Sequence, residues 1–202
     1  MEAKDYLKDI QDIKEMMSKS TQFISLSGLA GILAGIYALI GAYIVNQLIS
    51  NHSSYYVTLE SKTFKLILLT AVIVLVLSIV SAYILTAQKA KKQNEKVWNA
   101  SSKRLLANFS IPLITGGILI LLLLKNGSYG LIAPMTLIFY GLACVNASKY
   151  TFRDIKYLGI TEIILGLFAV QFSGYVLVFW ILGFGVCHIL YGSIMYFKYE
   201  RN

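Results

Sequence analysis

The sequence predicts an all-α membrane protein, a bundle of six transmembrane helices arranged as three helical hairpins. Two observations predict this fold class. The 202-residue chain is 57% hydrophobic and only 14% charged, unlike an average soluble domain. Its apolar residues also form long continuous runs without the alternation of strands, and most runs are near the ~20 residues that a membrane-crossing helix needs. The six runs cover residues 22–49, 64–88, 105–124, 130–148, 157–172 and 176–197.

The basic residues between the runs predict the orientation of the bundle. Of the 18 Lys and Arg residues, fifteen fall in alternate segments and only three in the others. Basic residues near the ends of a span resist translocation, so we expect the basic segments, and both termini, in the cytoplasm. The net charge of +8 then indicates contact with membrane lipids rather than nucleic acid. The fifteen lie in 1–21, 89–104, 149–156 and 198–202, and the other three are Lys62, Lys65 and Lys125.

Residues 1–21 are expected to form a cytoplasmic amphipathic helix before the transmembrane domain of residues 22–202. Tyr6, Ile10, Ile13 and Met17 recur at helical spacing on one face. This face suits contact with another helix, either in a homo-oligomer or protein partner through residues 6–17 or in the bundle itself. The alternative is a surface helix that only introduces the first span.

Small residues recur along the first span. Gly28, Gly31, Gly35 and Ala38 lie three or four positions apart, which lets another helix approach closely within a membrane. The pattern favours packing against another span of the same chain, and a dimer interface is the alternative.

Short outer turns predict that spans three and four, and spans five and six, pair as hairpins. The segments Gly159–Ala169 and Leu182–Gly192 resemble the hairpin unit of the HdeD-type acid-resistance membrane proteins. This resemblance, and a looser one to uncharacterised bacterial six-span membrane proteins, implies three hairpins in a bacterial cytoplasmic (inner) membrane. The chain departs from the HdeD pattern in lacking proline in the turn between spans five and six and in having a charged N-terminal helix. The resemblance implies no catalytic residues.

Two ionisable residues lie within the last two runs, where such residues are expensive and often functional. Glu162 lies ~9 Å beyond Lys156 and His188 ~15 Å before Lys198 by helical rise. This depth difference of ~6 Å predicts that direct pairing needs a tilted helix or a bridging water. Glu162 could couple to protons or ions, or extend its side chain to the membrane edge. His188 could bind haem or a metal, or be a hydrogen-bonded core residue with Tyr191 as its partner.

Asn108 is a further polar candidate because of Pro112. A proline has no N–H to donate to the carbonyl four residues earlier, so the carbonyl of Asn108 is left free. Free carbonyls in broken helices can coordinate cations. The alternative is a simple kink or helix start near the interface.

The function expected is that of a non-enzymatic integral membrane protein, a small sensor, scaffold or stress-response module acting through helix–helix contacts. The chain has no Gly-x-Ser-x-Gly, His-Glu-x-x-His or phosphate-loop motif. Cys144 and Cys187 lie inside spans without metal-ligand spacing, so no metal site is predicted, and the sequence identifies no cofactor. The alternatives are a small-molecule or ion transporter that uses Glu162 and His188, and a haem- or lipid-binding membrane protein.

Overall fold

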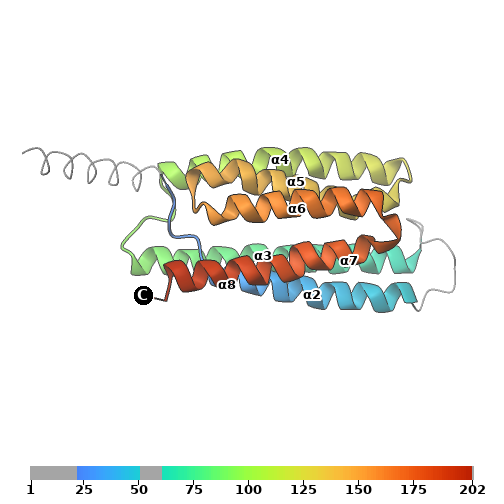
Figure 1. The fold of residues 1–202 in the computed structure, drawn as a ribbon, viewed down its shortest axis with the longest axis horizontal. Helices are drawn as coiled ribbons and strands as arrows, with labels where there is room; N and C mark the ends of the chain where they lie inside the picture. The colour runs from blue at the N-terminus through green and yellow to red at the C-terminus, as the bar shows by residue number, and fades with distance from the viewer. Residues whose placement is uncertain (1–21, 51–60, 202) are drawn as a thin grey trace, which may run out of the picture.

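The computed structural model describes residues 22–50 and 61–201, and in these ranges the chain is helical with no strands (Figure 1). The all-α prediction is therefore confirmed for the described residues, whereas the amphipathic helix predicted for residues 1–21 lies outside them. The α-helices are α2 (Gly28–Ser50), α3 (Lys62–Lys92), α4 (Ala100–Lys125), α5 (Ile132–Ala147), α6 (Asp154–Gln171), α7 (Val176–Trp180) and α8 (His188–Tyr199). The 3₁₀ turns are η1 (Tyr129–Leu131), η2 (Ser148–Tyr150) and η3 (Ser173–Tyr175), and η4 (Ile181–Cys187) is a π-helix.

Five helical segments of the described chain are long and apolar enough to cross a membrane, compared with the six spans that the sequence predicts. The difference is α6, which is 18 residues long and contains Asp154, Lys156 and Glu162. Its charge, rather than its length, separates it from the other helices. The five segments are Gly28–Ser50, Lys62–Lys92, Ala100–Lys125, Tyr129–Tyr150 and Ser173–Tyr199.

The helices pack as two groups (Figure 1). In one group α5 packs along both α4 and α6, and in the other α2 packs along both α3 and α8. The segment formed by α7, η4 and α8 belongs to the second group but also contacts α5 and α6. Leu137 and Ala143 of α5 and Ala169 of α6 are fully buried, which places the tightest packing between these two helices.

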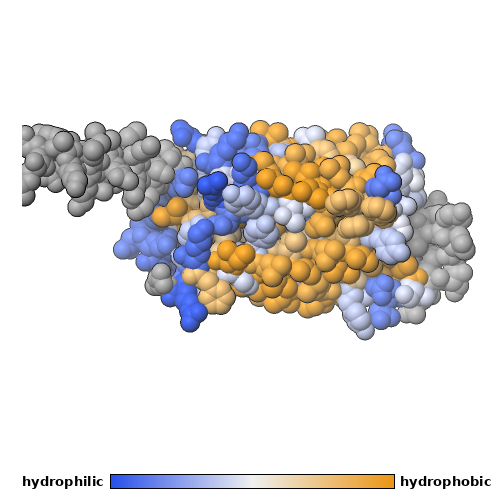
Figure 2. All heavy atoms as spheres, in the orientation of Figure 1, coloured by the Kyte–Doolittle hydropathy of each residue, from blue (hydrophilic) through white to orange (hydrophobic). Residues whose placement is uncertain are grey.

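The surface has an apolar belt between two polar ends (Figure 2). The helix α3 contributes most to it, because large apolar side chains are exposed along nearly its whole length, from Leu66 to Ile84. We call the more polar end the basic end and define it as residues 22–27, 88–104, 149–154 and 198–201. Hydrogen bonds and ion pairs join these four segments.

The first helix begins later than the apolar run predicts. Residues 22–27 are not helical and cross the basic end, and α2 begins only at Gly28. The N–H of Phe23 donates to the carbonyl of Tyr150 at 2.7 Å, and the Ser25 hydroxyl donates to Glu95 at 2.5 Å. These contacts give polar groups of the non-helical segment partners elsewhere at the basic end. The run 22–49 therefore contains a non-helical segment, residues 22–27, which we call the strap, followed by the helix α2.

Candidate functional site

Three polar side chains from three helices meet inside the bundle, and we call them the core polar cluster: Glu162 of α6, His188 at the start of α8 and Tyr140 of α5. The Nδ1 atom of His188 lies 3.3 Å from Glu162 Oε1, and its Nε2 atom lies 2.8 Å from the Tyr140 hydroxyl. The exposed fractions of Glu162 and His188 are 0% and 5%. Glu162 and His188 are therefore buried, and Tyr140 is partly buried.

Glu162 and His188 pair directly, although depth counting predicts a gap of ~6 Å. Lys198 of α8 forms an ion pair with Asp154 of α6 at 3.2 Å. These two positions therefore lie at about the same height along the bundle axis. Counted from this pair, Glu162 is eight residues along and His188 ten, a difference of ~3 Å. The count from Lys156 was wrong because α6 begins at Asp154, so the helices are offset by less than the apolar runs indicate.

Tyr191 is not the partner of His188. Its hydroxyl lies 3.5 Å from Thr161 Oγ1, while the hydroxyl that reaches His188 is that of Tyr140. Sequence reasoning missed Tyr140, although one indication was present. Tyrosines of membrane proteins concentrate at the interfaces, and Tyr140 is near the middle of its run.

The carboxylate of Glu162 has no hydrogen-bond donor among the described residues. The Nδ1 atom of His188 also lies 3.2 Å from the carbonyl oxygen of Gly183. Because a carbonyl oxygen only accepts, this contact assigns a proton to Nδ1 and directs it toward Gly183. A carboxylate in apolar surroundings without donors is costly. A proton on the carboxyl group, or a positive charge on the adjacent imidazole, removes this cost.

The π-helix η4 shapes this part of the cluster. In a π-helix each backbone hydrogen bond joins residues five positions apart, rather than four as in an α-helix. Such segments often occur at functional sites. Here η4 ends at Cys187, immediately before His188, and presents the Gly183 carbonyl to the ring. A side chain at position 183 would overlap the Glu162 carboxyl group and Leu137. Gly183 therefore lets the backbone approach Glu162 closely.

Aromatic rings surround the polar atoms on the Tyr140 side. The Tyr140 ring lies 5.2 Å from that of Phe184, centroid to centroid, and 5.9 Å from that of Phe109. Trp180 continues the layer at 5.0 Å from Phe184. These rings exclude water and lower the local dielectric constant, which strengthens every charge interaction in the cluster.

The cluster can hold a proton in two arrangements of equal net charge. A neutral carboxyl group can face a neutral imidazole whose Nε2 accepts from Tyr140, or a carboxylate can face an imidazolium whose Nε2 donates to Tyr140. Gain or loss of one further proton changes the charge of the core by one unit. The three residues belong to α5, α6 and α8, so the cluster connects three helices of the bundle.

The described residues contain no group of three or more His, Cys, Asp or Glu side chains that could hold a metal ion. Cys144 is buried one helical turn after Tyr140, and Cys187 is half-buried beside His188.

The carbonyl of Asn108 is not free. The side-chain amide of Asn146 in α5 donates to it at 2.9 Å, which satisfies the acceptor that Pro112 leaves unpaired. The side chain of Asn108 itself donates to the carbonyl of Arg104 at 2.8 Å. The Asn108 carbonyl thus joins α4 to α5, whereas its side chain bonds within α4.

The small residues of the first span lie against the last helix of the same chain. A Cβ atom at Gly28 would meet the backbone of Gly192 and Tyr196, and one at Gly31 would lie 3.2 Å from the Cα of Gly192. Gly35 lies against the backbone of Gly185 and Ile189. Ala38 is buried, with 3% of its surface exposed. Within the described chain, these residues bring α2 close to η4 and α8.

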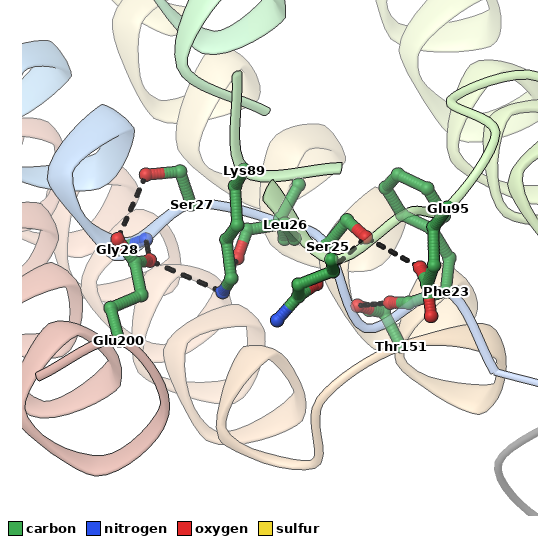
Figure 3. Close-up of polar contacts among 10 residues, drawn as sticks. Phe23, Ser25, Leu26, Ser27, Gly28, Lys89, Glu95, Thr151 and Glu200 are labelled. Carbon is green, nitrogen blue, oxygen red and sulfur yellow. Dashed lines mark hydrogen bonds and ion pairs between the residues drawn. The ribbon is translucent and has the colours of Figure 1, made fainter. Parts of the chain in front are cut away.

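At the basic end, Glu200 holds the start of α2 (Figure 3). Its carboxylate accepts from the N–H of Gly28 and from the Ser27 hydroxyl at 3.3 Å, and it lies 3.3 Å from Lys89 Nζ. A carboxylate at a helix N-terminus satisfies a free N–H and interacts favourably with the helix dipole. Lys89 also donates to the carbonyl of Leu26 at 2.8 Å, so α2, α3 and the C-terminal segment are joined at one point.

A second ionic contact at this end joins α6 to the C-terminal segment. The Tyr199 hydroxyl donates to Asp154 at 2.7 Å, and Lys198 lies 3.2 Å from the same carboxylate. Partial burial raises the pKa of Asp154, but the hydrogen bonds from Tyr199 and Lys198 outweigh it, so the pKa lies below its ordinary value of 3.8. Asp154 is therefore ionised at neutral pH and keeps α6 and α8 in register.

No protein-family model, curated protein or solved structure matches this chain. The resemblance to the HdeD-type proteins stays a prediction.

Proposed function

We propose that this chain is a non-enzymatic integral protein of the bacterial cytoplasmic membrane that senses protons through the core polar cluster. In this proposal α6 also crosses the membrane, which brings the number of spans to six, and the basic end lies in the cytoplasm. A change of proton occupancy at Glu162 and His188 alters the packing of α5, α6 and α8. This places the protein among small sensor or stress-response modules.

One observation carries the proposal: Glu162 is fully buried, has no hydrogen-bond donor among the described residues, and lies 3.3 Å from a histidine that a tyrosine and a backbone carbonyl orient. Structural ion pairs in membrane proteins are normally satisfied by their partners. An incompletely paired carboxyl group kept beside an imidazole is instead suited to exchanging a proton.

The chain supplies a reporter for this exchange. It has two tryptophans, and Trp180 lies 5.0 Å from Phe184, whose ring lies 5.7 Å from that of His188. In a Trp98→Phe background, we expect the emission of Trp180 to change as the pH of the purified protein is varied. Glu162→Gln removes the ionisable group with little change in volume, so the transition should disappear.

The matched control is Glu95→Gln, the same chemical change at the basic end, and it should leave the transition unchanged. Infrared difference spectra between acidic and alkaline pH give a second readout, in which the band of a protonated carboxyl group should be lost only in Glu162→Gln. If Glu162→Gln keeps both the fluorescence transition and this band, the proposal is wrong.

A proton-coupled transporter is the second candidate. His188 follows η4 in the group of α2, α3 and α8, whereas Glu162 and Tyr140 belong to the group of α4, α5 and α6. A site between two helix groups is where transporters bind their coupling ion. Proton flux into liposomes that Glu162→Gln abolishes would favour transport, and absence of flux with the unmodified protein would favour the sensor.

A further inference from the structure

The helices α3 and α4 are consecutive in the chain but do not pack extensively against one another. The main neighbour of α3 is α2, and that of α4 is α5, and Figure 1 shows α3 and α4 in different groups, connected at the basic end. Consecutive helices joined by a short segment usually lie side by side. The seven residues 93–99 therefore connect two helices that belong to different groups and have no extensive contact with one another.

Both helices are apolar where they leave the basic end. Near its C-terminal end α3 exposes Ile79, Tyr83 and Ile84, and near its N-terminal end α4 exposes Leu106 and Ile111. In a membrane, acyl chains are the solvent for such surfaces. The two helices thus provide apolar walls that begin at the level of the connecting segment.

The connection and the adjoining ends of α3 and α4 are strongly basic. Five exposed cationic residues of this region form no salt bridge with any described residue. The one acidic residue between them, Glu95, already accepts from the Ser25 hydroxyl. Trp98 is 62% exposed beside them, as is typical of a side chain at a membrane interface. The five residues are Lys91, Lys92, Lys96, Lys103 and Arg104.

We propose that an anionic phospholipid binds between α3 and α4 at the basic end, with its headgroup on these five cations and its acyl chains along the two helices. The proposal rests on the membrane placement proposed above but not on the core polar cluster. Charge complementarity selects the occupant: a second copy of this chain would bring its own uncompensated cations to the same surface, whereas an anionic headgroup neutralises them.

Native mass spectrometry of the purified full chain tests this proposal. We expect the protein to retain phosphatidylglycerol several-fold more than phosphatidylcholine. The triple variant Lys91→Gln/Lys92→Gln/Lys96→Gln should lose most of this preference. The matched control is Lys62→Gln/Lys65→Gln/Lys125→Gln, which removes the same charge from exposed lysines at the other end and should keep the preference.

Location is tested separately, with a photoactivatable phosphatidylglycerol whose crosslinked peptides should map to residues 79–111. The proposal is overturned if the two lipids are retained equally, if both triple variants lose retention to the same degree, or if crosslinks fall elsewhere. It is also overturned if a lipid-free dimer protects these lysines from modification. Glu162→Gln should leave lipid retention unchanged, so failure of the proton proposal and failure of this one are distinguishable.

Discussion

At the scale of single residues, the main feature of this molecule is a carboxyl group that the fold buries without satisfying. Among the residues that the structure describes, the side chain opposite Glu162 that can carry positive charge is that of His188, and the Nδ1 proton of His188 is directed to Gly183. Tyr140 holds the far side of the ring. Tyr140 therefore decides how firmly His188 is oriented toward Glu162, although it does not touch Glu162 in the cluster.

The contribution of Tyr140 is measurable by removing its hydroxyl group. Tyr140→Phe leaves His188 Nε2 buried without a partner, and an unsatisfied buried polar atom costs about 1–3 kcal/mol. We expect a clear decrease in the midpoint of thermal unfolding in detergent. The control is Tyr191→Phe, because the Tyr191 contact with Thr161 is long at 3.5 Å; an equal loss in both variants would contradict this role of Tyr140.

At the scale of elements, glycine sets the close approach of α2 and α8. A Cβ atom at Gly192 would lie 2.7 Å from the N atom of Ile32 and 2.8 Å from the carbonyl oxygen of Gly28. Both are backbone atoms, so they cannot move without moving α2. Gly192 thus lets α2 and α8 lie this close together because it has no Cβ atom.

We therefore expect Gly192→Ala to force α2 and α8 apart and to destabilise the protein by about 1–3 kcal/mol, as overpacking does in other cores. The control is Gly117→Ala in α4, where a Cβ atom would meet nothing within 4 Å. This second substitution should be neutral or slightly stabilising, because alanine favours helix over glycine. Thermal unfolding of both variants measures the difference, and equal midpoints would show that the interface tolerates a methyl group.

Much of the element level could be predicted from sequence, and the exceptions have physical causes. Continuous apolar runs predict helices because the membrane requires every backbone group to be paired internally. Residues 22–27 are apolar enough to be predicted as helix but are not helical, because groups of the connecting segments form hydrogen bonds with them instead. The π-helix η4 also has no periodic pattern that would predict it. Estimating the depth of Glu162 and of His188 from the ends of their own apolar runs could not predict their contact. The relative height of two helices depends on contacts between them, such as that of Asp154 with Lys198.

At the scale of the whole molecule, charge is distributed asymmetrically between the two ends of an apolar belt (Figure 2). The basic end carries the strap, the Glu200 contact and the exposed cations of the connection 93–99 and the adjoining ends of α3 and α4. The opposite end contains Lys62, Lys65 and Lys125 among the described basic residues. This asymmetry is the basis for the proposed orientation, with the basic end in the cytoplasm.

The orientation is tested with single cysteines at positions 62 and 96 in a chain whose Cys144 and Cys187 are replaced by alanine. In intact cells, a membrane-impermeant thiol reagent should label Lys62→Cys and leave Lys96→Cys unlabelled. Both positions should react once the membrane is permeabilised, which controls for local accessibility. Labelling of position 96 alone in intact cells would reverse the orientation.

The carboxylate of Glu200 on the N-terminus of α2 has a consequence for biogenesis. The ribosome completes α2 long before it adds residue 200, so the newly inserted helix waits with its first amide uncapped and its glycine face uncovered. The helix that covers this face, α8, is synthesised after α2 to α7. The bundle can therefore close at this point only after residue 200 has been added, and a nascent chain arrested before that residue has no Glu200 carboxylate to accept from the first amide of α2.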